Sequence, residues 1–243
     1  MLIYDASTWE AWHFVAWAAF VLVGIEVLNF IVLHMDAFFH GQIPAGGKPL
    51  DKLTLKDQLF IAFNKFTTMF FSYHVIRFAW YSGNVKWGSE NITLANTIGS
   101  FIAFHIVYDL FYTWFHRILH IRALYPYVHK HHHRQHVPSR GNTDAVNVHP
   151  FEFLTGEYLH LFCIWLIPSH IFTVAVFILL GGFLASLNHT RVDVTMNSIY
   201  QVKFHDLHHR IPTVNYGQYI MLWDWIFGSF QPYSKVDAEK AAQ

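Results

Sequence analysis

The sequence is poor in charged residues and in cysteine, and each shortage excludes a class of protein. Charged residues make up 13% of the 243 positions, against roughly 25% in soluble domains. Positive and negative charges balance to about zero, so no basic surface for nucleic acid is expected. The single cysteine, Cys163, stands in an apolar run. A disulfide framework and a zinc site built from cysteines are therefore excluded.

Long apolar runs are abundant instead. Apolar residues reach 53% of the chain and aromatic residues 19%. Crossing a hydrocarbon core of about 30 Å takes about 20 apolar residues, and four runs approach or exceed that length: 12–33, 59–81, 98–114 and 158–187. The fourth contains Pro168 and is long for one crossing, which favours a broken helical hairpin. A domain of this size cannot bury four such runs. We predict an all-α, multi-pass transmembrane helical bundle.

Basic residues predict how this bundle is oriented. Residues 1–11 contain no lysine or arginine, whereas Lys48, Lys52 and Lys56 follow the first run. Five more basic residues follow the third run: Arg117, Arg122, Lys130, Arg134 and Arg140. Because basic loops stay on the cytosolic side, we expect the N-terminus outside and the C-terminus inside a bacterial inner membrane or the endoplasmic reticulum. The first run lacks a preceding basic segment and a clear cleavage site, so we expect it to be retained.

Histidines concentrate in three blocks that follow the apolar runs. His116 and His120 are four residues apart at the end of the third run, and Asp109 lies seven residues before His116. The other two blocks repeat one spacing, i, i+3 and i+4: His129, His132 and His133, then His205, His208 and His209. Residues at these spacings share one face of a helix. We therefore predict a cytosolic-side helical cap in which eight imidazoles converge, while His131 points elsewhere.

The histidine blocks do not fit a solvated metal-binding tract. Such a tract requires a flexible context, whereas aromatic and aliphatic residues flank these blocks. Lone histidines such as His34, His74 and His170 are expected to serve packing. Eight imidazoles exceed the needs of one tetrahedral zinc and suffice for two octahedral ions, although imidazole also suits zinc, copper and nickel. The pair Glu157 and His160 matches the Glu-x-x-His pattern of soluble di-iron bundles, and we interpret it as a coincidence.

The blocks HRILH (116–120), HKHHH (129–133) and HDLHH (205–209) resemble the three histidine boxes of the fatty acid hydroxylase / sterol desaturase superfamily. The resemblance includes HPFE at 149–152, NHT at 188–190 and NYGQYIMLWDWIFGSF at 215–230. It suggests three parts: N-terminal transmembrane helices (1–94), a hydroxylase-like catalytic domain (95–230) and a polar C-terminal tail (231–243).

This resemblance implies an integral-membrane di-iron oxygenase that hydroxylates a lipid, such as a sterol or fatty acyl chain, with dioxygen. The implied ligands of the two iron ions are His116, His120, His129, His132, His133, His189, His205, His208 and His209. His149 is expected beside the pocket. Hydrogen bonds from the second ring nitrogens to carboxylates or carbonyls would orient the ligands. Asp109, Asp206 and Asp224 are the candidate carboxylates.

Several functional details stay open at the level of sequence. A lipid desaturase would use the same site, and hydroxylation is our first choice. A metal transporter would place histidines along a path through the membrane, whereas these lie to one side of the apolar runs. A non-catalytic lipid-binding member would not need three intact boxes. No fused cytochrome b5-like domain is expected, so electrons would come from a separate cytochrome b5-like protein or a ferredoxin with its reductase. Some relatives carry a histidine where this chain has Ala185, which favours a sterol-oxidase-like or bacterial branch.

Overall fold

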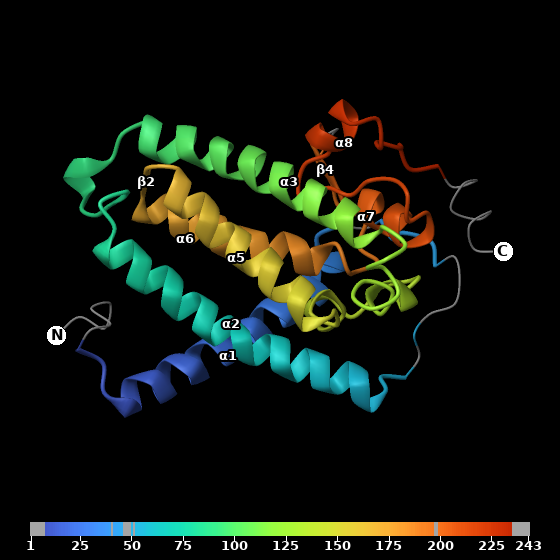
Figure 1. The fold of residues 1–243 in the computed structure, drawn as a ribbon, viewed down its shortest axis with the longest axis horizontal. Helices are drawn as coiled ribbons and strands as arrows, with labels where there is room; N and C mark the ends of the chain where they lie inside the picture. The colour runs from blue at the N-terminus through green and yellow to red at the C-terminus, as the bar shows by residue number, and fades with distance from the viewer. Residues whose placement is uncertain (1–7, 40, 46–49, 51, 197–198, 235–243) are drawn as a thin grey trace.

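Five long helices dominate the computed structural model, which describes residues 8–39, 41–45, 50, 52–196 and 199–234. They are α1 (Ala11–Leu33), α2 (Leu55–Tyr81), α3 (Ser100–Leu119), α5 (Pro150–Leu166) and α6 (Ile171–Leu187). Figure 1 shows the connection from α2 to α3 at one end of the molecule and the shorter C-terminal elements at the other. Lys48 and the predicted tail from residue 235 onward lie outside the described residues.

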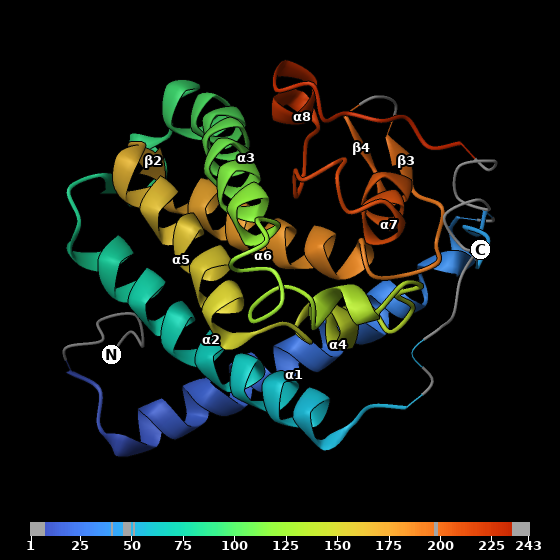
Figure 2. The same cartoon turned by 45° about the vertical axis from the view of Figure 1, so that its right-hand side comes forward.

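Shorter elements complete the described part of the chain. Three short helices, α4 (Asn142–Ala145), α7 (Val202–Arg210) and α8 (Leu222–Ile226), lie toward one end of the long helices (Figure 2). Strand β1 (Val85–Lys86) pairs in parallel with β2 (Ser169–His170), and β3 (Thr195–Met196) pairs antiparallel with β4 (Tyr200–Gln201). Single turns of 3₁₀ or π helix occur at Met35–Ala37, Ser89–Asn91, Ala95–Gly99 and His132–Arg134.

The fourth apolar run is broken, as the sequence predicted. Helix α5 ends at Leu166 and α6 begins at Ile171, with Pro168 between them. Proline has no N–H to donate to a continuing helix, so a break at this position is expected. The break also holds strand β2, whose pairing with β1 ties it to the connection between α2 and α3. Helix α5 starts earlier than the predicted run, at Pro150, where His149 caps it.

Within the part of the chain that the structure describes, two helical stretches are long and apolar enough to cross a membrane, Ala11–Ala37 and Ala95–Leu119. Helix α6 is apolar but shorter. Helix α2 is long, yet it contains Lys65 and Arg77 and does not pass the same test. The four predicted crossings therefore stay a prediction, whereas the mostly helical architecture is confirmed.

The helices expose far more apolar surface than a soluble protein normally does. In α1 the only buried residue is Val32, while Phe20 is 68% exposed and Phe30 63%. In α6, Leu179 is 71% exposed. Contiguous apolar faces of this kind mark membrane or partner contacts, so they fit helices that lie in lipid.

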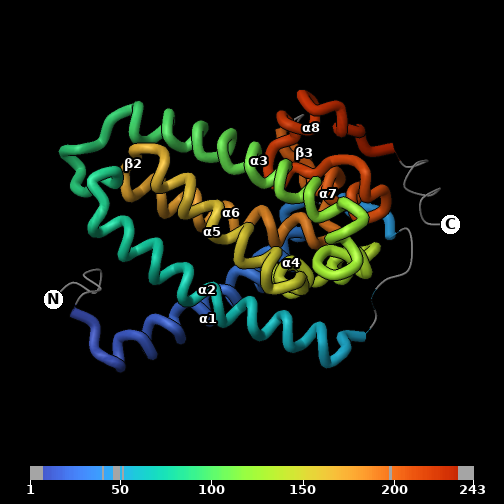
Figure 3. The backbone as a smooth tube through the Cα atoms, viewed as in Figure 1, coloured from blue at the N-terminus to red at the C-terminus, as the bar shows by residue number. Residues whose placement is uncertain are grey.

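Two apolar cores hold the helices together. The larger core includes Phe71 of α2, Phe104 of α3, Cys163 of α5 and Phe177 of α6. The smaller core joins the end of α1 to the end of α6 and the start of α7, through Val32, Leu187 and Val202 among others. Figure 3 shows how the chain between α3 and α5 folds back over the ends of the long helices, near α7. The histidine blocks are therefore held at one end of the bundle.

Candidate metal centre

Nine histidines lie in two adjacent groups at this end of the bundle. The five-histidine group contains His116, His120, His129, His133 and His208. The four-histidine group contains His132, His189, His205 and His209. Within each group, one ring nitrogen per residue lies within 4.8 Å of all the others. The structure thus brings together all nine histidines named from the sequence, including His189, while their role as ligands stays a proposal.

Regular elements position the first and third blocks. His116 lies in the last turn of α3 and His120 caps that helix. His205, His208 and His209 all lie on α7, where every residue except Lys203 is buried. These two blocks therefore lie on α-helices, as the spacing of their histidines predicted.

The second block departs from the expected α-helix. Residues 121–131 form a series of turns, followed by one 3₁₀ turn at His132–Arg134. The backbone bonds are mixed: His129 N–H reaches the carbonyl of Tyr125, and His132 N–H reaches that of His129. The prediction of a regular helix for this block is wrong. His129 and His133 join the five-histidine group, whereas His132 joins the other group.

The second block thus contributes histidines to both groups, as α7 does with His208 in one group and His205 and His209 in the other. The ring centroids of His132 and His133, which are neighbours in sequence, are 5.9 Å apart. The ring of His133 is also 5.3 Å from that of His209, across the boundary between the groups. Two ions held in these groups would therefore be close neighbours.

The facing ring nitrogens are arranged as donors to a cation would be. His116 Nδ1 lies 2.8 Å from the carbonyl oxygen of Tyr216, so Nδ1 carries the hydrogen and Nε2 presents a lone pair. That lone pair faces His129 Nε2 at 2.9 Å. His208 Nδ1 likewise donates to the carbonyl of Val214, at 2.7 Å, and its Nε2 is buried without a hydrogen-bond partner among the described residues. Buried lone pairs of this kind call for a partner, and a metal ion would supply it.

The four-histidine group also contains ring nitrogens that face one another. His189 Nδ1 lies 2.8 Å from the carbonyl of Ala185. Its Nε2 therefore presents a lone pair, which lies 3.2 Å from His205 Nε2 and 3.4 Å from His132 Nε2. His209 Nε2 lies 3.1 Å from His205 Nε2. The donor sets of both groups therefore fit metal ions that prefer imidazole, iron among them.

Burial keeps these imidazoles in the form that binds metal. It lowers the pKa of His129 to about 3. Burial, together with the neighbouring imidazoles, also lowers the pKa of several others well below the ordinary value: His132, His133, His205, His208 and His209. Because a protonated imidazole cannot coordinate, a depressed pKa preserves ligand capacity at neutral pH.

The three aspartates offered as partners of the imidazoles contact other groups among the described residues. Asp224 accepts hydrogen bonds from the backbone N–H groups of Tyr216 and Gly217, at 2.9 and 2.7 Å. Asp109 accepts from the N–H groups of Gln218 and Tyr219. Both carboxylates therefore hold the C-terminal loop, whose carbonyls at Val214 and Tyr216 orient two histidines. Their effect on the imidazoles is indirect, through the backbone.

Asp206 has a different surrounding from the one expected. It forms ion pairs with Arg191 and with Arg210, the latter at 2.9 Å. Arg191 and Arg210 both also donate to the carbonyl of Pro44. Asp206 thus neutralises two arginines beside α7. Arg210 is 8% exposed and makes these contacts inside the protein rather than at its surface.

Glu152 is the carboxylate that sequence reasoning missed. It is buried, and its Oε1 lies 2.9 Å from His129 Nδ1. The signal was present in the HPFE motif, which we interpreted through His149. In the structure His149 accepts a hydrogen bond from Phe151 N–H and caps α5. That cap places Glu152 in the first turn of the helix, facing the five-histidine group.

The Glu-x-x-His pair lies outside both groups, in agreement with its interpretation as a coincidence. Glu157 accepts a hydrogen bond from Thr68 at 2.6 Å. His160 Nε2 lies 3.0 Å from the hydroxyl of Tyr219. Both residues belong to the packing of α5 against its neighbours.

The chain belongs to the family described as "Fatty acid hydroxylase", whose sequence model matches residues 101–229, more than half of the chain. This confirms the resemblance. It is similar to a Delta(7)-sterol-C5(6)-desaturase from Nicotiana tabacum, with 29% identity over 52% of this chain and 48% of the relative. It is also similar to human lathosterol oxidase, with 32% identity over 57% of this chain and 47% of the relative.

A longer match is to methylsterol monooxygenase 2-1 from Arabidopsis thaliana, 28% identical over 71% of this chain and 69% of the relative. The first curated relatives are matched over only about half of their own length. No solved structure matches the chain.

Proposed function

We propose that this chain is a membrane-bound di-iron oxygenase that hydroxylates a lipid with dioxygen. The observation that carries the proposal is the pair of adjacent groups of buried histidines, with ring nitrogens that face one another within each group. Two iron ions bound there would supply the activation of dioxygen. Zinc would suit imidazole as well, but it has no redox chemistry and would be inert toward a C–H bond.

The side chains around the irons would hold and orient them. His116, His208 and His189 each have one ring nitrogen fixed by a backbone carbonyl, which aims the other nitrogen into its group. Such hydrogen bonds fix the tautomer of a ligand and raise its basicity. Burial of eight of the nine rings keeps bulk water away from the site. The chain's own contribution is therefore a rigid, water-poor set of neutral ligands.

The substrate class follows from the surface and from the relatives. The exposed apolar faces of α1 and α6 support a protein embedded in lipid, so a membrane lipid would reach the site from the bilayer. The names of the relatives favour a sterol over a fatty acyl chain. The methylsterol monooxygenase match covers more of this chain than the sterol desaturase matches do, which supports hydroxylation as the first choice.

Desaturation by the same site is the second candidate. It is favoured by the similarity to Delta(7)-sterol-C5(6)-desaturase. In both cases a separate electron donor, either a cytochrome b5-like protein or a ferredoxin with its reductase, would supply electrons from the cytosolic side. We propose a multi-pass membrane protein of the endoplasmic reticulum or a bacterial inner membrane.

Labelled dioxygen distinguishes the candidates. Purified protein in detergent would be loaded with iron and supplied with a reductase system, a methylsterol or Δ7-sterol, and ¹⁸O₂. One labelled oxygen in the product supports hydroxylation, and a new double bond without label makes the enzyme a desaturase. Protein that binds no iron, or binds iron but never consumes oxygen with any lipid, contradicts the proposal. It would then favour a transporter or a non-catalytic lipid binder.

A further inference from the structure

One face of α2 packs against the segment that carries the second histidine block. Asp57, Phe60 and Asn64 occupy positions i, i+3 and i+7, which share a helix face. Asn64 is fully buried and donates hydrogen bonds to the carbonyls of Val146 and Val148, at 2.8 and 2.9 Å. The ring of Phe60 lies edge-on to His131, with centroids 4.8 Å apart. Helix α2 therefore contacts both ends of the segment 131–148.

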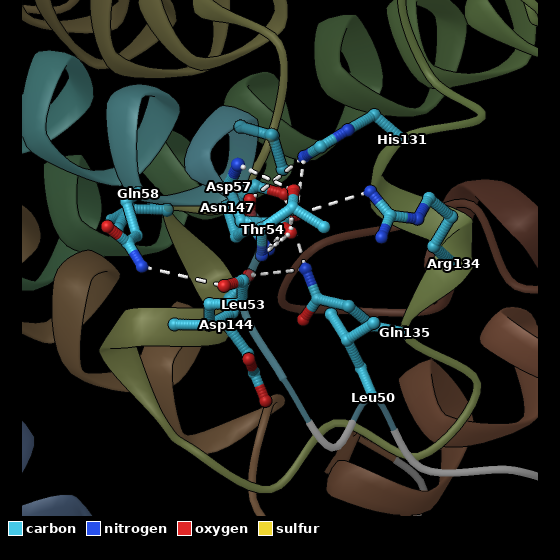
Figure 4. A network of polar contacts seen from close by, with 12 residues as sticks. Leu50, Leu53, Thr54, Asp57, Gln58, His131, Arg134, Gln135, Asp144 and Asn147 are labelled. Atoms are coloured by element: carbon cyan, nitrogen blue, oxygen red, sulfur yellow. Dashed lines mark hydrogen bonds and ion pairs between the residues drawn. The ribbon is translucent and has the colours of Figure 1, made fainter.

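Asp57 is the centre of this contact (Figure 4). It is fully buried, and its Oδ2 accepts from the backbone N–H of Thr54 at 2.7 Å, as part of the cap of α2. Its Oδ1 lies 3.0 Å from His131 Nε2 and accepts from Asn147 Nδ2 at 3.1 Å. Arg134 Nη1 lies 3.4 Å from the same oxygen. One carboxylate thus joins the start of α2 to three residues of the segment.

Two acceptor oxygens lie close to the Nε2 atom of His131. Its Nε2 lies 3.0 Å from Asn147 Oδ1 as well as 3.0 Å from Asp57 Oδ1. Because both partners are acceptors, Nε2 carries a hydrogen and has no lone pair for a metal. His131 therefore lies off the metal-facing side, as its spacing predicted, yet it is buried and bound rather than idle.

The contacts of His131 with Asp57 and Asn147 matter because of its position in the chain. The next two residues, His132 and His133, enter different histidine groups. The second block has no α-helix to fix it, only turns and one 3₁₀ turn. A small rotation of this backbone would move both rings away from their groups. Contacts outside the block therefore add to its own backbone hydrogen bonds in holding its conformation.

We propose that Asp57 and His131 form a positioning pair, which locks the second block so that His132 and His133 each reach their own metal. The inference rests on the proposed metal centre. Asp57 lies outside residues 101–229, the part matched by the family model. The N-terminal helices thus complete the metal centre rather than only anchoring it in the membrane.

Two substitutions at His131 separate the hydrogen bond from ring packing. His131→Phe keeps a ring against Phe60 but removes the donor to Asp57 and Asn147. His131→Gln loses the ring but offers an N–H near the position of Nε2. Anaerobic Fe(II) titration of the full chain in detergent measures the affinity, and Mössbauer spectra of ⁵⁷Fe-loaded protein report the two sites. We expect about 10- to 100-fold weaker binding for the Phe variant, the loss typical of removed partners of metal ligands, and near-normal binding for the Gln variant.

Ser100→Ala is the matched control. Ser100 is buried and donates to the carbonyl of Pro168, but it lies at the opposite end of α3, about 24 Å from His116 at 1.5 Å per residue. It tests for general destabilisation and should bind iron like the wild type. Wild-type affinity in His131→Phe, or an equal loss in both His131 variants, overturns the positioning pair. A wild-type protein that binds no iron overturns the proposed function itself.

Discussion

The two histidine groups differ in how their ligands are supported. In the five-histidine group, His116 and His208 donate to backbone carbonyls, and His129 has the carboxylate of Glu152 at 2.9 Å. In the four-histidine group, His189 Nδ1 donates to the backbone carbonyl of Ala185. The Nδ1 atoms of His132, His205 and His209 are buried without a hydrogen-bond partner among the described residues. The same holds for His133 and His129 of the five-histidine group, although His129 has Glu152 as a close neighbour. Polar contacts therefore reach three of the five rings in the first group and one of the four in the second.

Exposure separates the groups as well. All members of the four-histidine group are buried, whereas His120 of the other group is partly exposed. Two ions bound in these groups would therefore not be equivalent. The five-histidine group has more ligands and better-oriented ones, so we expect it to bind iron more tightly. Variants and conditions that abolish or enlarge this difference in iron affinity test the comparison.

Removing one ligand from each group should have the largest effect. In the double variant His132→Ala, His208→Ala, each group loses an imidazole, and we expect loss of both irons and of all turnover. Iron content by mass spectrometry and oxygen consumption measure the result. His34→Ala, at an exposed histidine outside both groups, is the control and should keep both irons. Full metal occupancy in the double variant would refute the assignment of the site.

Lowering the pH should protonate imidazoles in both groups alike. The expected difference in iron affinity between the groups should therefore disappear. The folded metal-free protein has a pKa of about 3 at His129, against about 6.5 when unfolded. The unfolded chain therefore binds more protons as the pH falls below 6.5, and folding stability is lost toward pH 3. For His129 alone this amounts to about 2 kcal/mol between pH 7 and pH 5, and the other buried histidines add to it.

Thermal unfolding of the metal-free protein in detergent at pH 7 and pH 5 measures this loss. We expect a lower Tm at pH 5, and a smaller decrease in the double variant, which has two fewer buried imidazoles. An equal Tm at the two pH values would contradict the burial of these rings in a neutral form.

Loosening the C-terminal loop should weaken only the five-histidine group. Asp224→Asn weakens the bonds to the N–H groups of Tyr216 and Gly217, and this loop supplies the carbonyls that orient His116 and His208. We expect a loss of about 10-fold in affinity at this group, the lower part of the range for outer partners, with the other group unchanged. Iron titration followed by Mössbauer spectroscopy separates the two. Asp193→Asn, which breaks a surface ion pair with Lys203, should change neither.

The histidine set was predictable because local spacing carried the information. His205, His208 and His209 lie on a real helix, as their periodicity predicted, and that helix serves both groups. The second block has the same spacing but no α-helix, and it packs against α2. Asp57 and His131 are 74 positions apart in the chain, and no local pattern records their pairing.

The support of the ligands was less predictable than the ligands themselves. Asp109 lies on the same helix as His116, as expected, but it binds the loop at Gln218 and Tyr219, more than a hundred residues away. Glu152 stands within the HPFE motif, and only the fold shows that it faces His129. The helical class follows from the long apolar runs, whereas the number of crossings depends on how polar residues such as Lys65 are accommodated. Lys65 pairs with Glu26 of α1, a contact between two helices that composition does not reveal.

The smallest effect is expected at Glu152, and it tests the unequal support of the two groups most directly. Burial raises the pKa of Glu152 to about 8, so the carboxylate would carry its negative charge at neutral pH only beside bound cations. Glu152→Gln keeps the size of the side chain and an oxygen that can accept from His129 Nδ1, but it cannot carry that charge. A charged acceptor binds roughly twice as strongly as a neutral one, so the ligand basicity of His129 should fall while its orientation persists. We expect the iron affinity to decrease a few-fold, below the range of about 10- to 100-fold for lost partners, and only in the five-histidine group.

Glu152→Ala, which removes the acceptor, should lower the affinity within that range. A Gln variant as weak as the Ala variant would mean that charge rather than orientation governs this ligand. Iron titration with Mössbauer assignment decides between them. If either variant changes the four-histidine group instead, the two groups are coupled through the second block, and their unequal support does not make the sites independent.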